Sequence, residues 1–246
     1  AGYERIMVKF KARDDVLVHA RTFKEYGYVH IPDFIDASDA TSLYEQLRQQ
    51  TDWRQVLTTT SGFVELDRAT RSGMAPETAK ALDNAVYAQA RADFQYRFET
   101  VRVPDSEAER VASTDRIFDF ARMMSSGDVR DFLRVVTGAE DIQYADAQAT
   151  AYSPGDFLTG HDDAVTGKSR RAAYVFGLTP MWRLEWGGLL LFHGSDGNVE
   201  RGLVPTFNSL NLFAVPRMHS VSEVTRAAAY RRYSITGWLR AETQPL

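Results

Sequence analysis

Two histidines and one aspartate are the residues whose types and spacing point most directly to chemistry. His161 and Asp163 stand two positions apart, and in an extended segment residues i and i+2 point to the same side. An imidazole and a carboxylate placed in this way can bind one metal ion from one side. The pair alone is weak evidence, because five His and 33 acidic residues produce close to one such spacing by chance. A solvated turn with a capping Asp is the simpler alternative.

A third ligand for the same metal is offered by His219, which lies on another predicted strand. Two His and one carboxylate form the facial set that holds Fe(II) and leaves positions open for substrates and dioxygen. A lone His at the start of a strand is more often structural, so the surrounding residues have to decide. The chain has no Cys, which excludes disulfides, Cys-ligated zinc, iron–sulfur clusters and thiol catalysis and leaves metal chemistry to His and carboxylates.

An anchor for an anion is predicted near the C-terminus. If the run 231–238 is a strand, Arg232 and Ser234 point to one face, and a guanidinium with a hydroxyl suits a carboxylate deep in a barrel. Taken alone, the run favours the alternative of an edge strand with a solvated Arg.

The elements that must position these residues change character near residue 141. From there to Leu239 the chain has short β-prone runs, and between Ile142 and Tyr152 polar or aromatic residues alternate with alanines. The alanine face suits packing against helices, and the polar face then looks into a cavity that would hold a ligand. We expect a mainly β fold with bracing helices (α+β), and further strands near 172–178, 188–192, 209–214, 220–224 and 232–239.

Residues 1–140 are predicted to be largely helical. Helices are expected over about 14–26, from a cap at Ser38 onward, and over 75–97, 115–124 and 129–136, with a short strand at 28–31. The polar stretch from Thr58 to Gly73 predicts a mobile loop or lid. Its Arg68 and Arg71 are candidates for contacting an acidic or carboxylate-bearing substrate, although solvated loop cations are the simpler interpretation.

Several motifs occur in a particular order. They are Tyr152-Ser-Pro-Gly155-Asp-Phe157-Leu158, His161-Asp-Asp163, Trp182, Trp186-Gly187-Gly188-Leu189, Pro205, His219-Ser-Val221 and Arg232-Tyr-Ser234-Ile-Thr-Gly237-Trp238. The combination resembles the 2-oxoglutarate and Fe(II)-dependent dioxygenases, specifically their prolyl 4-hydroxylase-like branch, and the run 27–34 is similar to the usual entry of that family.

The resemblance implies a double-stranded β-helix, a jelly-roll or cupin-like barrel, with His161, Asp163 and His219 as iron ligands. It also implies that Arg232 binds the distal carboxylate of 2-oxoglutarate, helped by Ser234 and Tyr152. One departure is Gly177, where many members carry a Tyr. The far end of 2-oxoglutarate is then held differently or in a roomier pocket, and Tyr174 compensates only if the strand register differs.

The implied reaction is hydroxylation of an unactivated C–H bond, with Fe(II), 2-oxoglutarate and O2 as cofactors, ascorbate as reductant, and succinate and CO2 as co-products. Peptidyl proline, another amino-acid-like compound or another small molecule could be the substrate. The alternative is a non-catalytic barrel that keeps a metal and acts as a binding or scaffold module.

Length and charge set the remaining expectations. We expect one domain over 1–246, with helical support and lid in 1–140 and the barrel core in 141–240. The net charge is −4 and the basic residues are scattered, so we expect a small-molecule or polypeptide partner and neither nucleic acid nor membrane. No apolar run is long enough for a membrane span, and the first five residues lack a signal-peptide core, which favours a cytoplasmic protein. The oligomeric state is not readable.

Overall fold

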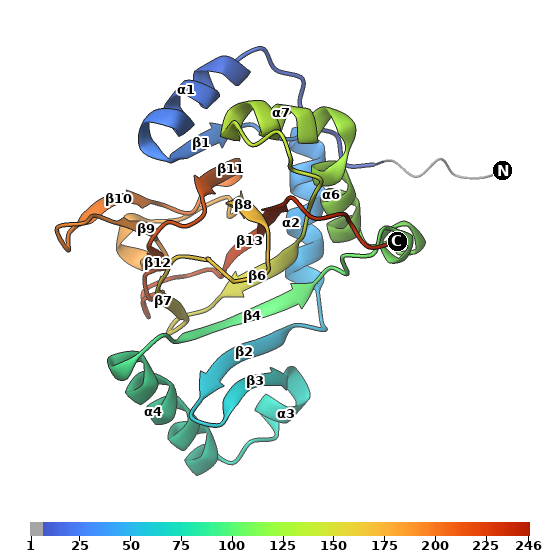
Figure 1. Cartoon of the computed structure of the whole chain (residues 1–246). Helices are drawn as coiled ribbons and strands as arrows, with labels where there is room; N and C mark the ends of the chain where they lie inside the picture. Colours follow the sequence, from blue (N-terminus) through green and yellow to red (C-terminus); the bar gives the residue numbers. More distant parts are fainter. Residues whose placement is uncertain (1–6) are drawn as a thin grey trace.

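The computed structural model describes residues 7–246 and consists of a curled antiparallel sheet with helices against it (Figure 1). The helices are α1 Val16–Tyr26, α2 Ala37–Gln49, α3 Arg68–Ser72, α4 Pro76–Ala92, α5 Glu107–Ala112, α6 Arg116–Ser125 and α7 Gly127–Thr137. The strands are β1 Tyr28–Pro32, β2 Arg54–Thr59, β3 Gly62–Asp67, β4 Tyr96–Arg102, β5 Tyr144–Ala145, β6 Gln148–Tyr152, β7 Phe157–His161, β8 Arg170–Leu178, β9 Leu190–His193, β10 Val199–Leu203, β11 Phe207–Ala214, β12 His219–Val221 and β13 Arg232–Arg240.

The strand order confirms the predicted jelly-roll class. Neighbouring strands follow the path β1-β11-β8-β13-β6-β4-β7-β12-β9-β10, so strands that are distant in sequence lie side by side. Strand β4 pairs with β6 through its C-terminal half and with β7 through its N-terminal half, and it thereby joins the two layers of the curled sheet. Strands β2 and β3 extend the sheet beyond β4.

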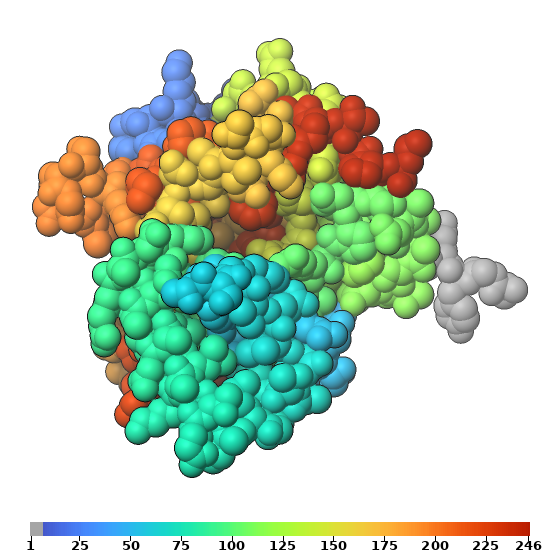
Figure 2. Space-filling view, turned by 60° about the horizontal axis from the view of Figure 1, so that its bottom comes forward, coloured from blue at the N-terminus to red at the C-terminus, as the bar shows by residue number. Residues whose placement is uncertain are grey.

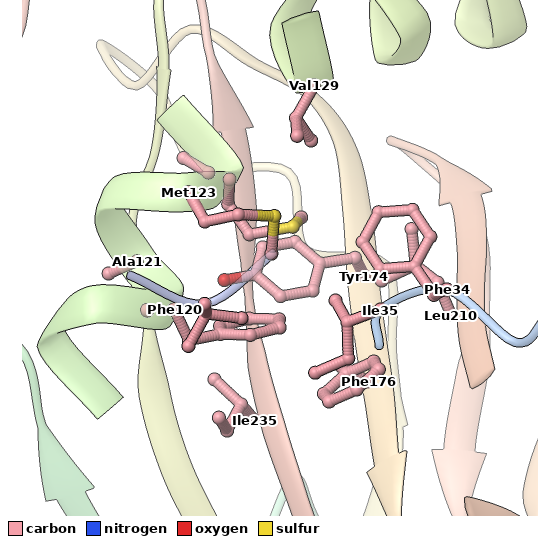
Figure 3. Packing of buried hydrophobic residues seen from close by; sticks show 14 of the residues in the cluster. Phe34, Ile35, Phe120, Ala121, Met123, Val129, Tyr174, Phe176, Leu210 and Ile235 are labelled. Atoms are coloured by element: carbon pink, nitrogen blue, oxygen red, sulfur yellow. The ribbon is translucent and has the colours of Figure 1, made fainter. Parts of the chain in front are cut away.

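Helices cover the outer face of the layer that contains β6, as the alternating alanines of residues 142–152 predicted. Ala145, Ala149 and Ala151 are fully buried in the main hydrophobic cluster together with residues of α2, α6 and α7. Figure 3 shows this packing, in which the Phe120 and Phe176 rings stack with their centroids 4.7 Å apart. Small side chains on the strands let helices approach closely, so this layer is a rigid support for the opposite face.

The N-terminal part corrects several details of the prediction. The expected polar loop 58–73 is wrong: these residues complete β2 and form β3 and the short helix α3. The helix expected over 75–97 ends at Ala92, and β4 follows it. Asp36, and not Ser38, occupies the N-cap of α2. The expected single strand 142–152 is divided into β5 and β6.

Two expectations concern the chain as a whole. Residues 1–5, on which the expected lack of a leader rests, lie outside the described residues. Within residues 7–246, no helix combines the length and the apolar content that crossing a bilayer requires.

Candidate metal and co-substrate site

The pairing of the neighbouring strands β7 and β12 brings the three predicted ligands together. His161 ends β7 and His219 begins β12, and the two residues are direct partners in the antiparallel register. The Nε2 atom of His161 lies 3.3 Å from Asp163 Oδ1, and the Nε2 atom of His219 lies 3.4 Å from Asp163 Oδ2. One ligand atom from each side chain lies within 4.8 Å of the others. This donor set and spacing fit a single transition-metal ion.

Backbone carbonyls orient both imidazoles. The Nδ1 atom of His161 lies 3.0 Å from the Thr159 carbonyl, and the Nδ1 atom of His219 lies 2.7 Å from the Arg217 carbonyl. When Nδ1 donates its proton to these oxygens, the lone pair is on Nε2, which faces Asp163. Asp163 itself has a positive φ of 64°, and Arg170 donates from a terminal guanidinium nitrogen to its carbonyl oxygen at 2.9 Å. The geometry is therefore fixed before a metal binds.

The protonation states also suit a metal. Burial and, after it, the charge of the neighbouring His161 lower the pKa of His219 to about 4. Burial by itself would raise the pKa of Asp163, but the hydrogen bond from His161 and the charges of His219 and His161 outweigh it, so this pKa lies below its ordinary value. A neutral imidazole at His219 and an ionised carboxylate at Asp163 result near neutral pH, which are the forms that ligate metals.

Arg232 is a buried cation without a counter-ion among the residues that the structure describes. Its side chain is 4% exposed, its Nε has no hydrogen-bond partner, and its guanidinium lies 4.9 Å from the centre of the Tyr152 ring. Burial lowers its pKa. Leaving a buried charge unpaired is costly unless a ligand completes it. Gly188 leaves room for this side chain, because a Cβ there would lie 3.1 Å from Arg232 Cδ.

The two predicted helpers of Arg232 differ in position. Tyr152 lines the same cavity and stacks on Phe98 with ring centroids 5.1 Å apart, and burial raises its pKa. Ser234 faces the same side of β13, but it lies behind Thr150, whose Oγ1 is 2.8 Å from Ser234 Oγ. Ser234 is therefore placed to position Thr150, and Thr150 lines the cavity.

Gly177 does not leave a roomier pocket. A Cβ at this position would lie 2.4 Å from the Thr206 carbonyl oxygen, so backbone fills the space that a larger side chain would need. Tyr174 does not take over either. Its ring packs among the core residues of Figure 3, and its hydroxyl donates to the Asp146 carbonyl at 2.7 Å.

The cavity around these residues has a volume of about 870 Å³. In Figure 2 it is the hollow between the yellow segment that follows β7 and the cyan-to-green segment of β3, α4 and β4. Several wall residues were not among the predicted site residues, and they are Phe63, Phe94, Tyr96, Phe98, Arg102 and Arg170. The alternation of Tyr96, Phe98 and Thr100 with charged residues is the one signal that could have indicated β4.

Other predicted candidates lie elsewhere. Arg68 and Arg71 do not face the metal-binding residues: both bind Glu99 on the other side of the sheet, at 3.1 and 2.9 Å. His193, on β9, hydrogen-bonds Ser220 Oγ on the neighbouring β12 at 2.8 Å.

Comparisons with known proteins agree with this geometry. Residues 147–240 match the family model of the 2OG-Fe(II) oxygenase superfamily. The chain is 34% identical over 128 residues to the prolyl 3-hydroxylase sudestada1 of Drosophila melanogaster, a match that covers 47% of this chain and 23% of that protein. It is 36% identical over 118 residues to the prolyl 3-hydroxylase OGFOD1 of Xenopus laevis, covering 45% and 22%. The matches thus span less than a quarter of the length of these curated relatives.

Solved structures share the fold over most of the chain. A prolyl-4-hydroxylase of Pseudomonas putida has a TM-score of 0.61 at 17% identity, covering 92% of this chain and 98% of that one. A prolyl hydroxylase of Trichoplax adhaerens, solved with a peptide fragment of the hypoxia inducible factor oxygen degradation domain, has a TM-score of 0.59 at 16% identity, covering 92% and 89%. The family match over residues 147–240 and the fold shared with the solved structures make the chain similar to the 2-oxoglutarate and Fe(II)-dependent oxygenases, a family whose cofactors are Fe(II), 2-oxoglutarate and O2.

Proposed function

We propose that this chain is a hydroxylase that acts on an unactivated C–H bond, with His161, Asp163 and His219 as its iron ligands. One observation carries the proposal: a three-ligand cluster and a buried, unpaired arginine share the wall of one cavity. The cluster fits a metal ion, and Arg232 fits the distal carboxylate of 2-oxoglutarate. A barrel that served only as a scaffold would have no use for a buried cation without a partner.

Each residue has a distinct part in this proposal. The two imidazoles and the carboxylate would hold the iron, since their ligand atoms face one another in the cavity wall. Arg232 binds and orients 2-oxoglutarate through a charge-assisted contact. Fe(II) and 2-oxoglutarate, when bound, would let O2 act as the oxidant: one oxygen atom would enter the succinate that forms with CO2 from 2-oxoglutarate, and the other would be inserted into the substrate C–H bond. Tyr152 and Phe98 form an apolar wall that excludes water from the reacting atoms.

A prolyl residue in a polypeptide is the substrate class that we propose. The support comes from the names of the relatives and from the rim of the cavity, where the Phe63 and Phe94 side chains are exposed although they are large and apolar. Deeper in the wall, the Arg170 guanidinium lies 3.5 Å from the centre of the Trp238 ring, with its Nε unpartnered. The Arg170 guanidinium offers hydrogen-bond donors and the Trp238 ring offers an apolar surface, and together they suit the ring of a prolyl residue.

Two parts of the proposal concern the whole chain and its reductant. Residues 1–246 are proposed to act as one domain, which is supported by the pairing of β1 with β11 and of β4 with β6 across the two halves. A requirement for ascorbate stays a prediction.

Mass spectrometry tests the function. The chain is incubated with Fe(II), 2-oxoglutarate and O2, together with a library of proline-containing peptides and, separately, with free amino acids. A gain of one oxygen on a peptide, absent with His161→Ala, is the expected result. Product from free amino acids alone would exclude the polypeptide class, and an absence of both product and succinate would favour the binding module.

A further inference from the structure

The ribbon of β2 and β4 has two faces, and each face lines a different cavity. Val56 and Phe98 line the cavity of the metal-binding residues. The alternating residues Gln55, Arg97 and Glu99 line a second cavity on the other face, which is closed by residues of α3 and α4. In Figure 1 these two helices lie beyond β2 and β3, away from the other helices.

The second cavity has a volume of about 590 Å³, which is within the range of small-molecule sites. Four arginines from separate parts of the chain contribute to its wall: Arg68 and Arg71 from α3, Arg97 from β4, and Arg231 just before β13. Its two acidic residues are Asp83 and Glu99. The wall is therefore positive in a protein whose net charge is −4.

Glu99 gathers three of these arginines. Its side chain is buried, and it accepts from Arg68 Nε at 3.1 Å and from a terminal nitrogen of Arg71 at 2.9 Å, both on Oε1. A terminal nitrogen of Arg231 binds Oε2. One carboxylate neutralises one guanidinium, so a surplus of two positive charges remains around it.

The fourth arginine does not remove that surplus. Arg97 binds Asp83 at 2.6 Å and lies 3.3 Å from Asp156, which sits behind it and outside the wall. Four arginines carry four positive charges, and Glu99, Asp83 and Asp156 carry three negative charges, so the group as a whole is still positive.

A purely structural role does not require this surplus. One arginine would suffice to pair with Glu99, and each additional guanidinium adds like-charge repulsion. Arg68 and Arg71 are only partly buried, and each keeps N–H groups that bind no residue in the described part of the chain. Converging guanidiniums in a concave wall are the usual arrangement for multidentate recognition of oxyanions.

We propose that this second cavity binds a small anion that carries at least two negative charges on oxygen atoms, such as a phosphate ester or a polycarboxylate. The site is separate from the metal cavity, so the proposal does not depend on the proposed function.

Calorimetric titration with sodium sulfate at constant ionic strength tests the proposal, using the full chain loaded anaerobically with Fe(II). We expect saturable binding of one sulfate, with a Kd on the order of 10 mM or tighter. Arg71→Gln and the double variant Arg68→Gln/Arg71→Gln should weaken it at least tenfold, and Arg71→Lys should recover part of it. Arg232→Gln, in the metal cavity, and the exposed Arg48→Gln should bind sulfate like the unmodified chain.

Three outcomes overturn the proposal. The first is that sulfate does not bind saturably, and the second is that the folded double variant, with unchanged circular dichroism, binds sulfate as tightly as the unmodified chain. The third is that Arg232→Gln loses sulfate binding, which would place sulfate in the metal cavity. If the double variant does not fold, the comparison of Arg71→Gln with Arg71→Lys decides. Titrations with phenyl phosphate and with tricarballylate then show which anionic group the cavity prefers.

Discussion

Arg231 and Arg232 are consecutive in the chain, yet their guanidiniums lie on opposite sides of the sheet. Arg232 is buried in the wall of the metal cavity, whereas Arg231 binds Glu99 in the second cavity and lies 5.3 Å from the centre of the Trp53 ring. The pairing of Arg232 with Tyr152 and of Ser234 with Thr150 fixes this register. The two residues thus provide a matched pair of variants.

Removal of the Arg232 guanidinium should weaken 2-oxoglutarate binding. The contact is charge-assisted and desolvated, so Arg232→Ala should cost about 2 to 5 kcal/mol, or tens- to thousands-fold in affinity. Arg231→Ala should leave that affinity within about threefold, because its side chain points away. Anaerobic titration of 2-oxoglutarate at saturating Fe(II) compares the two. Weaker binding in Arg231→Ala than in Arg232→Ala would show that the assignment of the anchor is wrong.

A tyrosine at position 177 should destabilise the fold and should not improve co-substrate binding. The first side-chain atom would already meet the Thr206 carbonyl at 2.4 Å, and forced overpacking against backbone costs about 3 kcal/mol or more. Gly127→Ala is the control, because no atom lies within 4 Å of its added Cβ. Urea unfolding measures both, and a Gly177→Tyr variant as stable as the unmodified chain would contradict the packing described above.

Asp156 should make stability depend on pH. Burial raises its pKa to about 6, so the folded chain holds a proton there more tightly than the unfolded chain does. Its stabilising contribution is therefore complete below about pH 4 and is lost as the pH rises through 6. Asp156→Asn cannot ionise and should gain up to about 3 kcal/mol relative to the unmodified chain between pH 4 and pH 8. Urea unfolding at both pH values tests this, and a difference that does not change with pH would refute it.

Hydrogen exchange tests the expected motion of residues 58–73. Most of this segment is a β-hairpin, and β2 also pairs with β4, so we expect β2 to exchange slowly. The tip between Thr59 and Gly62 and the outer strand β3 should exchange faster and become protected when substrate binds. Uniform protection of both strands, with and without substrate, would argue against a lid.

The elements that could be predicted are those whose pattern is local. Helices α6 and α7 have periodic apolar residues and recognisable ends, such as Asp115, whose side chain accepts from Ile117 N, and Gly138 in the left-handed region. Strand β4 was not predicted, and its first residues were assigned to the helix expected over 75–97, because one of its faces carries the charged residues Arg97 and Glu99. Those charges are buried only through partners that come from distant parts of the chain.

The candidate site divides in the same way. The spacing of His161 and Asp163 is local, but their approach to His219 depends on the pairing of β7 with β12. Arg170 was not predicted as a site residue. Its place in the site depends on contacts with the Asp163 carbonyl and the Trp238 ring, and no local sequence pattern indicates these contacts. Arg68 and Arg71 were expected in a polar loop or lid, but the chain forms a hairpin and a helix there, and both side chains bind Glu99 on the face of the sheet away from the metal-binding residues.

The most direct test of the central claim is the formation of succinate from 2-oxoglutarate, measured with Fe(II) and O2 for the unmodified chain and for His161→Ala, Asp163→Ala and His219→Ala. Because three ligands share one ion, the loss of any one should cost several kcal/mol of metal affinity and nearly all turnover while circular dichroism stays unchanged. Succinate from the unmodified chain and from none of the folded variants is the predicted result. Full turnover by any two of the variants, or no turnover by the unmodified chain, would contradict the account.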